Sequence, residues 1–273
     1  MDDQTATLKI LSLFLVIVSI GAVATCLLTS WNLLRRKILV LTLLLGTLAS
    51  STIAGATTSV AATRGLGRPL SNDADGQLPD LFKAIYVSEI FHVITVGLGK
   101  LAFMVIFYTI LSGSSLTTIT RSISAVVCFL VLWTLTMSIV VSLQCQPPKV
   151  WNLSGKCFNL TALWKYFGAM NIAIESLLFI VPSVLVYRLH MPLQKRLVAI
   201  AFLSVRTLNI VVSGIQLRHV NGFDNDQRSL SMSLWPWMMC SQVLHTVTII
   251  SACVPFLREF LESFPSGMFK PIN

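Results

Sequence analysis

The sequence predicts an all-α polytopic membrane protein, a single bundle of seven transmembrane helices over residues 1–273. Hydrophobic residues make up 55% of the chain and charged residues only 11%, whereas a soluble domain has about 25% charged residues. Seven apolar runs are each long enough for the roughly 20 residues that cross a hydrocarbon core. Backbone groups in lipid have to be hydrogen-bonded within their own segment, so the runs should be helices. Only short loops remain between them, and no soluble domain.

The predicted helices follow one another along the chain. Their spans are about 8–30, 38–62, 84–112, 122–143, 164–187, 196–217 and 234–257. The first run begins with the acidic stretch MDDQT and is longer than the roughly 7–15 residues of a signal-peptide core, so we expect it to be retained as the first helix. The third, fifth, sixth and seventh runs carry ionisable or amide side chains, which in a membrane usually face the interior of a bundle.

Basic residues in the loops indicate an orientation. Short basic clusters follow the first and the fifth predicted helices, and such clusters hold loops in the cytosol. They are Arg35, Arg36 and Lys37 in one loop and Arg188, Lys195 and Arg196 in the other. The opposite loops also carry basic residues, so the count alone is a weak guide. We expect a lumenal or extracellular N-terminus, a cytosolic C-terminus, and a location in the endoplasmic reticulum or the plasma membrane.

The loop at 144–163, QCQPPKVWNLSGKCFNLTAL, supports this orientation. It contains two glycosylation sequons, at Asn152 and Asn159. It also contains Cys145 and Cys157, which are spaced so that a disulfide could form in an oxidising lumen. The sequons can also arise by chance, Asn159 lies near the bilayer, and the cysteines can also be two free thiols. Together these features favour placing the loop outside.

The net charge of +9 raises the question of nucleic-acid binding. The basic residues are spread over loops on both sides of the membrane, which is typical of helix-end anchors near anionic headgroups. We therefore expect the lipid bilayer, and not nucleic acid, as the partner of these charges.

Helix three places three ionisable side chains on one face. At about 100° per residue, Glu89 and Lys100 point within roughly 20° of each other, and His92 lies about 60° to one side. With a rise of about 1.5 Å per residue, Glu89 and Lys100 are about 16 Å apart along the helix axis. They cannot pair directly, so each needs a partner on another helix, or water.

Further polar side chains lie in the last three helices. They are Asn171 and Glu175 in helix five, Arg206, Asn209, Ser213 and Gln216 in helix six, and Gln242 and His245 in helix seven. Glu175, Arg206 and His245 lie near the bilayer centre, where a lone charge would cost about 3 kcal/mol or more. One interpretation is a set of buried pairs that fix helix packing, for instance Glu175 with Arg206. The other is a polar pocket that opens outward or to the lipid, and both histidines fit either interpretation.

Motifs of soluble enzymes and of cofactor sites are missing from the sequence. There is no GxGxxG, P-loop, HExxH or GxSxG stretch. The two membrane histidines lie on different helices with no nearby thiolate, which makes a poor metal site. Retinal would need a lysine for a Schiff base, and helix seven has none; the mid-membrane lysine is Lys100, in helix three. We expect neither a metal nor a cofactor.

Four segments resemble a known family. They are YVSEIFHVITVGLGKLAFMVIFYTIL at 86–111, QCQPPKVWNLSGKCFNL at 144–160, NIAIESLLFIVPSVLVYRLHMPLQKR at 171–196 and IISACVPFLREFLESFPSGM at 249–268. In this order they resemble the fungal rhodopsin-domain family of seven-helix membrane proteins. That family includes satratoxin-cluster integral membrane proteins and receptor-like relatives of the appressorium-signalling kind. The resemblance runs from about residue 36 to about residue 268 and implies the topology without implying retinal.

The resemblance carries individual residues onto family positions. These are Glu89, Lys100, Cys145, Cys157, Asn171 and Pro255, together with the turn Pro192-Leu-Gln-Lys195. At Glu175 the family more often has Asp. Three positions depart from the family pattern, because Arg206 stands where a small residue is usual, Gln216 where an arginine is usual, and His245 where an apolar residue is usual.

One class of function is a membrane component of a fungal secondary-metabolite pathway, since members of the family it resembles are often encoded beside biosynthetic enzymes. The protein would bind a lipophilic intermediate and cyclise or isomerise it. A carboxylic acid in a dry site is held protonated. Glu89 or Glu175 would then protonate an alkene or epoxide, with a histidine such as His245 as the base. Other membrane-bound enzymes of the pathway would be further partners.

A second class is a G-protein-coupled-receptor-like chemosensor that binds its ligand from outside. The loops after helices three and five are short, which makes them poor docking surfaces for a G protein. A small-molecule transporter is a third interpretation, although the sequence shows no inverted repeat and no broken half-helices.

Overall fold

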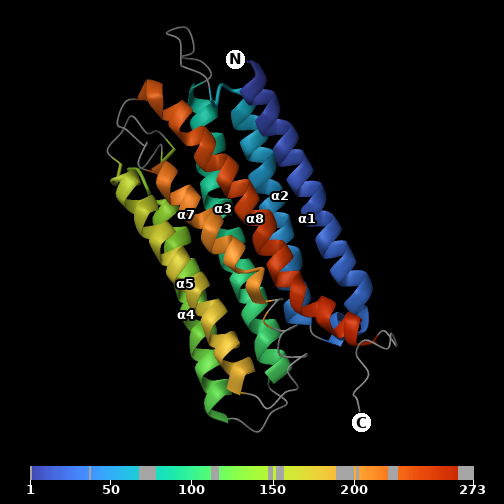
Figure 1. Ribbon diagram of the computed structural model, residues 1–273. Coiled ribbons are helices and arrows are strands. Elements are labelled where there is room, and N and C mark those ends of the chain that lie inside the picture. Colours follow the sequence, from blue (N-terminus) through green and yellow to red (C-terminus); the bar gives the residue numbers. More distant parts are fainter. Residues whose placement is uncertain are drawn as a thin grey trace, which may run out of the picture.

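The computed structural model describes residues 2–36, 38–67, 78–111, 117–146, 150–151, 157–188, 200, 203–220 and 227–263. The helices in this part of the chain are α1 (Asp2–Arg36), α2 (Ile38–Thr63), α3 (Leu78–Leu111), α4 (Thr117–Ser142), α5 (Leu160–Arg188), α7 (Thr207–Val220) and α8 (Gln227–Ser263). They run side by side as one elongated bundle (Figure 1). The predicted all-α, seven-helix architecture is confirmed.

Six of the described helices are long and apolar enough to cross a membrane. Their candidate spans are Ala6–Thr29, Ile38–Thr63, Pro79–Tyr108, Arg121–Ser142, Leu160–Val184 and Ser231–Pro255. The helices α1, α3 and α8 continue beyond the apolar runs that predicted them, because a helix can extend past the hydrocarbon core with polar residues at its ends. The protein is therefore an integral membrane protein with multiple spans.

Within the sixth predicted helix, at about 196–217, the described residues are helical except for a turn at Val205 and Arg206. Arg206 lies in a turn, and the regular helix α7 begins only at Thr207. The amide of Arg206 donates to the carbonyl of Leu203 at 3.0 Å, and the amide of Asn209 donates to the carbonyl of Arg206 at 3.0 Å. These tighter i to i+3 bonds often mark a hinge or a functional position within a helical stretch. Hydropathy depends on side chains and not on the pattern of backbone hydrogen bonds, so the turn could not be predicted from the apolar run.

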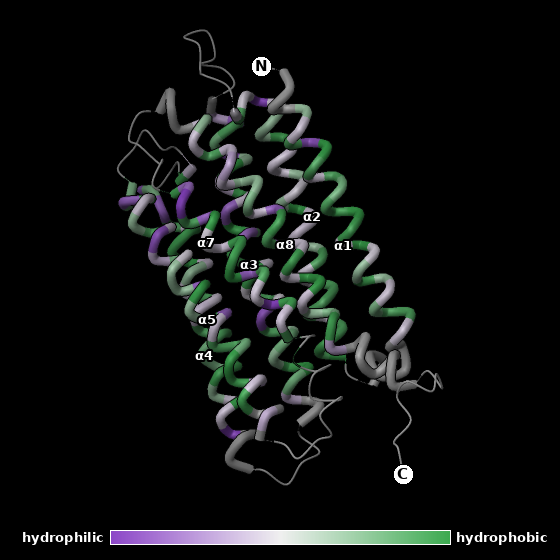
Figure 2. Tube along the Cα trace, viewed as in Figure 1, coloured by the Kyte–Doolittle hydropathy of each residue, from purple (hydrophilic) through white to green (hydrophobic). Residues whose placement is uncertain are grey.

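The helices α3 and α8 form the middle of the bundle. The helix α3 packs against α2, α4 and α8, and α8 also packs against α1, α2 and α7. Of the apolar windows of these helices, 67% of α3 and 72% of α8 is buried, against 22% of α1. Most of α1 is correspondingly hydrophobic along its length (Figure 2). The polar side chains between Ser88 and Lys100 on α3 and between Ser241 and Ser251 on α8 are accordingly buried against protein.

Two glycines let α3 approach its neighbours closely. A Cβ atom at Gly97 would lie 2.2 Å from Cγ2 of Thr134 in α4. A Cβ atom at Gly99 would lie 2.2 Å from Cγ2 of Thr248 in α8. Both distances are too short for any side chain, and small residues of this kind commonly mark close helix contacts in membranes.

The turn that follows α2 is hydrogen-bonded to the first residues of α8. Gly65 and Gly67 have φ angles of 109° and 84°, in the left-handed region that favours glycine. The amide of Gly67 donates to Oγ of Ser231 at 3.1 Å, and the Ser231 hydroxyl donates to the carbonyl of Gly65 at 2.9 Å. The turn after α2 and the first residues of α8 thus lie at the same end of the bundle.

A disulfide between Cys145 and Cys157 closes the loop that joins α4 to α5. Beside it, the amide of Phe158 donates to the carbonyl of Gln144 at 2.9 Å. Asn159 is exposed, and its Oδ1 accepts a hydrogen bond from the amide of Ala162 at 3.0 Å, so it caps the start of α5. Asn152, Lys37 and the stretch 192–196 lie outside the described residues.

Candidate functional site

Two groups of buried polar side chains lie inside the bundle. The charge cluster comprises Lys100, Asn171, Glu175, Arg206, Asn209 and Ser213. The histidine cluster comprises Glu89, His92, Gln144, Gln216, Ser241 and His245. Each of these residues is at most 5% exposed, so every polar atom among them depends on a partner within the protein.

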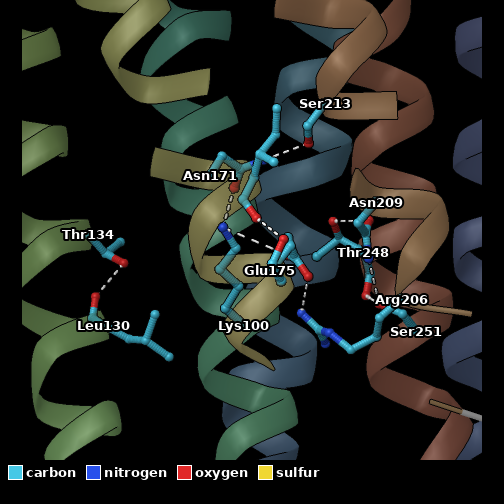
Figure 3. Close-up of polar contacts among 12 residues, drawn as sticks. Lys100, Leu130, Thr134, Asn171, Glu175, Arg206, Asn209, Ser213, Thr248 and Ser251 are labelled. Atoms are coloured by element: carbon cyan, nitrogen blue, oxygen red, sulfur yellow. Dashed lines mark hydrogen bonds and ion pairs between the residues drawn. The ribbon is translucent and has the colours of Figure 1, made fainter. Parts of the chain in front are cut away.

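Glu175 lies at the centre of the charge cluster. Its Oε2 accepts a hydrogen bond from Nη2 of Arg206 at 2.6 Å. Its Oε1 lies 3.7 Å from Nζ of Lys100. Figure 3 shows the carboxylate between the two cations, which come from different elements of the bundle. An unpaired buried charge is strongly destabilising, so this arrangement explains how both cations are tolerated.

Amide side chains extend the charge cluster to neighbouring helices. The ammonium of Lys100 donates to Oδ1 of Asn171, whose Nδ2 donates to Oγ of Ser213 at 2.7 Å. Farther along α7, Nδ2 of Asn209 donates to Oγ of Ser251 at 3.2 Å, and the Thr248 hydroxyl donates to Oδ1 of Asn209 at 3.2 Å. These bonds tie α3 to α5, α5 to α7 and α7 to α8 (Figure 3).

Aromatic rings cover both cations. The guanidinium carbon of Arg206 lies 4.1 Å from the ring centre of Phe103, and Nζ of Lys100 lies 5.3 Å from that of Trp133. The negative face of an aromatic ring attracts a cation, the more strongly where water is excluded. Two atoms of Arg206, Nε and Nη1, nevertheless have no hydrogen-bond partner in the described part of the chain.

The hydrogen bonds of the histidine cluster determine where its protons lie. The Ser241 hydroxyl donates to the carbonyl of Trp237 at 2.9 Å, so its oxygen accepts from Nε2 of Gln216 at 2.8 Å. The same amide nitrogen lies 3.4 Å from Nε2 of His92, a contact that favours a lone pair on this nitrogen. Nδ1 of His92 lies 2.8 Å from Nε2 of His245, and in the favoured tautomer it donates its proton to that nitrogen.

Aromatic side chains surround the ring of His92. Its ring centre lies 5.5 Å from that of Phe167, 6.0 Å from that of Trp164 and 5.4 Å from that of Trp237. Trp164 and Phe167 come from α5, and Trp237 comes from α8. The imidazole is therefore enclosed by aromatic rings.

Glu89 lies one helical turn before His92 on α3. Its Oε2 accepts a hydrogen bond from Nε2 of Gln144 at 3.1 Å. Gln144 directly precedes the disulfide-bonded Cys145, and its carbonyl is held by Phe158. The disulfide loop thus positions the amide that contacts the Glu89 carboxyl group.

Residues 38–263 match the family model described as the fungal rhodopsin domain. The chain belongs to the fungal rhodopsin-domain family. Searches among curated proteins and among solved structures return no match. The family match and the observed helices agree on a seven-helix membrane bundle, so the resemblance seen in the sequence is confirmed.

The predicted site residues of this fungal rhodopsin-domain protein do not form a single group. Lys100, Asn171, Glu175, Arg206 and Asn209 lie in the charge cluster, and Glu89, His92 and His245 lie in the histidine cluster. Gln242 belongs to neither, because its Nε2 donates to the Thr58 hydroxyl on α2 at 3.1 Å. Among the described residues, no group of three or more His, Cys, Asp or Glu side chains is placed to hold a metal ion.

Several contributors to the two clusters carry no sequence signal of their own. They are Phe103, Gln144, Trp164, Phe167, Trp237 and Ser241. Aromatic residues are common in membrane helices, and their side of the helix becomes meaningful only once the partners are placed. For Gln144 one hint exists, because it adjoins a cysteine of the predicted disulfide.

Proposed function

We propose that this protein binds a lipophilic intermediate of a fungal secondary-metabolite pathway beside the histidine cluster and cyclises or isomerises it by acid–base chemistry. One observation carries the proposal: a carboxyl group and an oriented imidazole lie one turn apart on α3, with three aromatic rings around the imidazole. The link to a biosynthetic pathway draws on the resemblance to a family that includes satratoxin-cluster membrane proteins.

His92 supplies the base in this proposal. Because His245 accepts the proton on Nδ1 of His92, Nε2 of His92 keeps its lone pair. Catalytic bases are commonly held in one tautomer by a third group in this way. The contact of Gln216 with that lone pair, at 3.4 Å, is long for a hydrogen bond, so a bound molecule can displace it. His245 then acts as a positioning residue.

Glu89 is favoured over Glu175 as the proton donor. The carboxylate of Glu175 is shared by Arg206 and Lys100, and it serves as their counter-ion. Among the described residues, Glu89 makes no ion pair and accepts a hydrogen bond from a neutral amide. A carboxyl group in such surroundings is suited to hold a proton and deliver it.

The chemistry balances without a further reagent. Glu89 transfers its proton to an alkene carbon or an epoxide oxygen of the substrate, which creates a cationic carbon. The rings of Trp164, Phe167 and Trp237 stabilise this charge while a carbon–carbon bond forms or shifts. Nε2 of His92 then removes a proton from the adjacent carbon, and a new double bond results. The product is an isomer of the substrate. Protonated His92 then releases its proton to water, and Glu89 takes up a proton from water.

Conversion by isolated membranes tests the proposal. Microsomes that contain this protein and no other pathway enzyme are mixed with extracts of a producing strain that lacks the gene, and the extracts are followed by mass spectrometry. We expect an accumulated intermediate to disappear. Glu89→Gln should lower the rate by roughly a hundredfold or more, and Asp80→Asn, an exposed carboxylate paired with Arg64 and Lys83, should leave it unchanged. An unaltered metabolite profile in the deletion strain would sink the proposal.

We also propose an orientation, with a lumenal or extracellular N-terminus, a cytosolic C-terminus, and a location in the endoplasmic reticulum or the plasma membrane. The Cys145–Cys157 disulfide supports it, since disulfides persist in oxidising compartments. If the loop is lumenal, a glycosidase should increase the gel mobility of the wild-type protein through Asn152 or Asn159. Loss of that shift in an Asn152→Gln, Asn159→Gln double variant is the control, and cytosolic modification of the loop would contradict the orientation.

A receptor is the second candidate, and the charge cluster favours it. A single carboxylate joins Lys100 on α3 to Arg206 next to α7. A ligand that withdrew Glu175 from either cation would release two helices at once, as a two-state switch requires. A ligand-dependent shift in cysteine accessibility, with no chemical conversion of the ligand, would favour the receptor.

A further inference from the structure

We propose that Arg206 binds the anionic head, a carboxylate or phosphate group, of a lipophilic ligand inside the bundle. The inference deepens the proposed function, because it rests on entry of a lipophilic molecule into the bundle and names the chemical class of that molecule. The residues of this anion site differ from those of the proposed chemistry, because Arg206 belongs to the charge cluster and takes no part in the proton transfers.

The unsatisfied donors of Arg206 are the first observation. The side chain is 1% exposed. Its Nη2 is used by Glu175, whereas Nε and Nη1 have no partner in the described part of the chain. A guanidinium has five N–H donors, of which one is on Nε and two are on Nη1. Buried donors are nearly always satisfied, so three without an acceptor indicate a missing partner.

The charge balance is the second observation. Within the charge cluster, two cations, Lys100 and Arg206, face one carboxylate, Glu175. An anion would complete the balance. A neutral Lys100 would remove the excess charge, but the donors of Arg206 would remain, because a guanidinium keeps its proton in proteins.

The geometry of the guanidinium suits a flat, bidentate anion. The Phe103 ring lies beside it, with 4.1 Å between the ring centre and Cζ of Arg206. A contact between an N–H group and an aromatic ring is weak, so the ring does not replace a hydrogen-bond acceptor for Nε and Nη1. Carboxylates and phosphates bind arginine edge-on through two parallel hydrogen bonds. The nearby apolar ring would contact the first carbon atoms of a hydrocarbon chain.

The backbone at Arg206 is compatible with such a site. Arg206 lies in a turn before α7 instead of within a regular helix. Irregular backbone at membrane depth is tolerated where it is buried in protein or lines a cavity.

A binding comparison tests the proposal. The protein is placed in nanodiscs of zwitterionic lipid, and the affinities of myristic acid and of myristyl alcohol are measured. We expect the acid to bind at least about tenfold more tightly than the alcohol, because a charge-assisted hydrogen bond contributes about that factor. Arg206→Gln should abolish the difference; this variant should fold, because Lys100 still pairs with Glu175. Arg64→Gln, which alters an exposed arginine, is the matched control and should preserve it.

A second variant separates binding from structure. Glu175→Gln removes the internal competitor for Arg206. Because it also leaves two buried cations, it is compared with the wild type only in nanodiscs where it keeps the wild-type helix content, and there its affinity for myristic acid should rise by about tenfold. If Arg206→Gln and Glu175→Gln both weaken binding of the acid, the arginine has only a structural role and the proposal is overturned. Nanodiscs with anionic lipid identify the source of the head group: competition by that lipid through Arg206 assigns the site to a membrane lipid, and absence of competition assigns it to a free ligand.

The remaining outcomes are decisive as well. Equal affinity for acid and alcohol overturns the anion site and leaves the proposed function standing. Absence of binding for both contradicts the proposed function too. Stabilisation by chloride alone, lost in Arg206→Gln and unaffected by myristic acid, would mean that an inorganic ion fills the site and would also overturn the inference.

Discussion

At the level of single residues, the sharing of Glu175 decides how the charge cluster responds to mutation. Lys100 and Arg206 both depend on this carboxylate, one at 3.7 Å and the other at 2.6 Å. Exposed pairs such as Asp80 with Arg64 contribute little, because water screens them. In the buried cluster, by contrast, removal of one partner leaves a charge without compensation. The three residues are therefore not interchangeable.

Glu175→Leu should be the most damaging change in the charge cluster. It leaves two buried cations and should lower stability by about 3–5 kcal/mol. Arg206→Leu should be milder, because Lys100 and Glu175 remain as a balanced pair. The double variant should lie between the two, because Lys100 loses its carboxylate partner and keeps its contacts with Asn171 and Trp133. The midpoints of thermal unfolding of the purified variants in detergent give their order of stability. An Arg206→Leu variant less stable than Glu175→Leu would contradict this prediction.

The hydrogen bond between His92 and His245 gives a second prediction at this scale. His245→Leu removes the acceptor that keeps the proton of His92 on Nδ1, so kcat of the proposed conversion should fall about a hundredfold or more while KM changes little. His245→Gln retains an oxygen that can accept the proton and should restore part of the rate. Equal activities in the two variants, at equal thermal stability, would show that His245 does not position His92.

Among the elements, α3 does the most to bring the polar residues together. Its face with Glu89, His92 and Lys100 could be predicted from helical periodicity, and all three side chains are buried. The turn at Arg206 could not be predicted, because an apolar run has the same hydropathy whether it forms a regular α-helix or contains a turn with i to i+3 hydrogen bonds. The partner of Glu89 was also hidden, since Gln144 comes from a loop whose path depends on the packing of α4 and α5.

Close packing of α3 against α4 gives the prediction for this scale. In Gly97→Ala the new Cβ would lie 2.2 Å from Cγ2 and 2.9 Å from Cβ of Thr134, whose short branched side chain has little room to move. We expect a loss of about 1–3 kcal/mol, measured as a lower midpoint of thermal unfolding. Gly21→Ala is the control, because nothing lies within 4 Å of a Cβ atom there. Equal midpoints for the two variants would mean that α3 and α4 are not in close contact.

For the whole molecule, hydropathy was sufficient to predict the bundle, because lipid leaves helices as the main way to satisfy a backbone. The contacts between helices within the bundle could not be predicted from hydropathy. Periodicity assigns a residue such as His245 to a face but says nothing of the rotation of α8 relative to α3, on which its bond to His92 depends. Glu175 and Arg206 were candidates for a pair, whereas the addition of Lys100 to the same carboxylate required the structure.

The disulfide loop connects the end of the bundle to the histidine cluster. Cys157→Ser should lower stability by about 2–4 kcal/mol, because the loop is no longer closed, and should loosen Gln144 from Glu89. Thermal unfolding with and without reductant measures the effect. The wild type should respond to reductant and the variant should not. Cys128→Ser, at an exposed free thiol, is the control. A wild type that is insensitive to reductant, with its thiols free, would contradict the disulfide.

Isotope incorporation during conversion bears on the acid–base proposal for the molecule as a whole. Microsomes with the wild-type protein are equilibrated in D₂O and supplied with the intermediate that accumulates without the gene. Because Glu89 delivers a proton exchanged with water and His92 removes a different one, the product should be an isomer of the substrate that carries a single deuterium, and Glu89→Gln membranes should yield none. A product of different elemental composition, or a wild-type product without deuterium, would contradict proton transfer by Glu89 and His92.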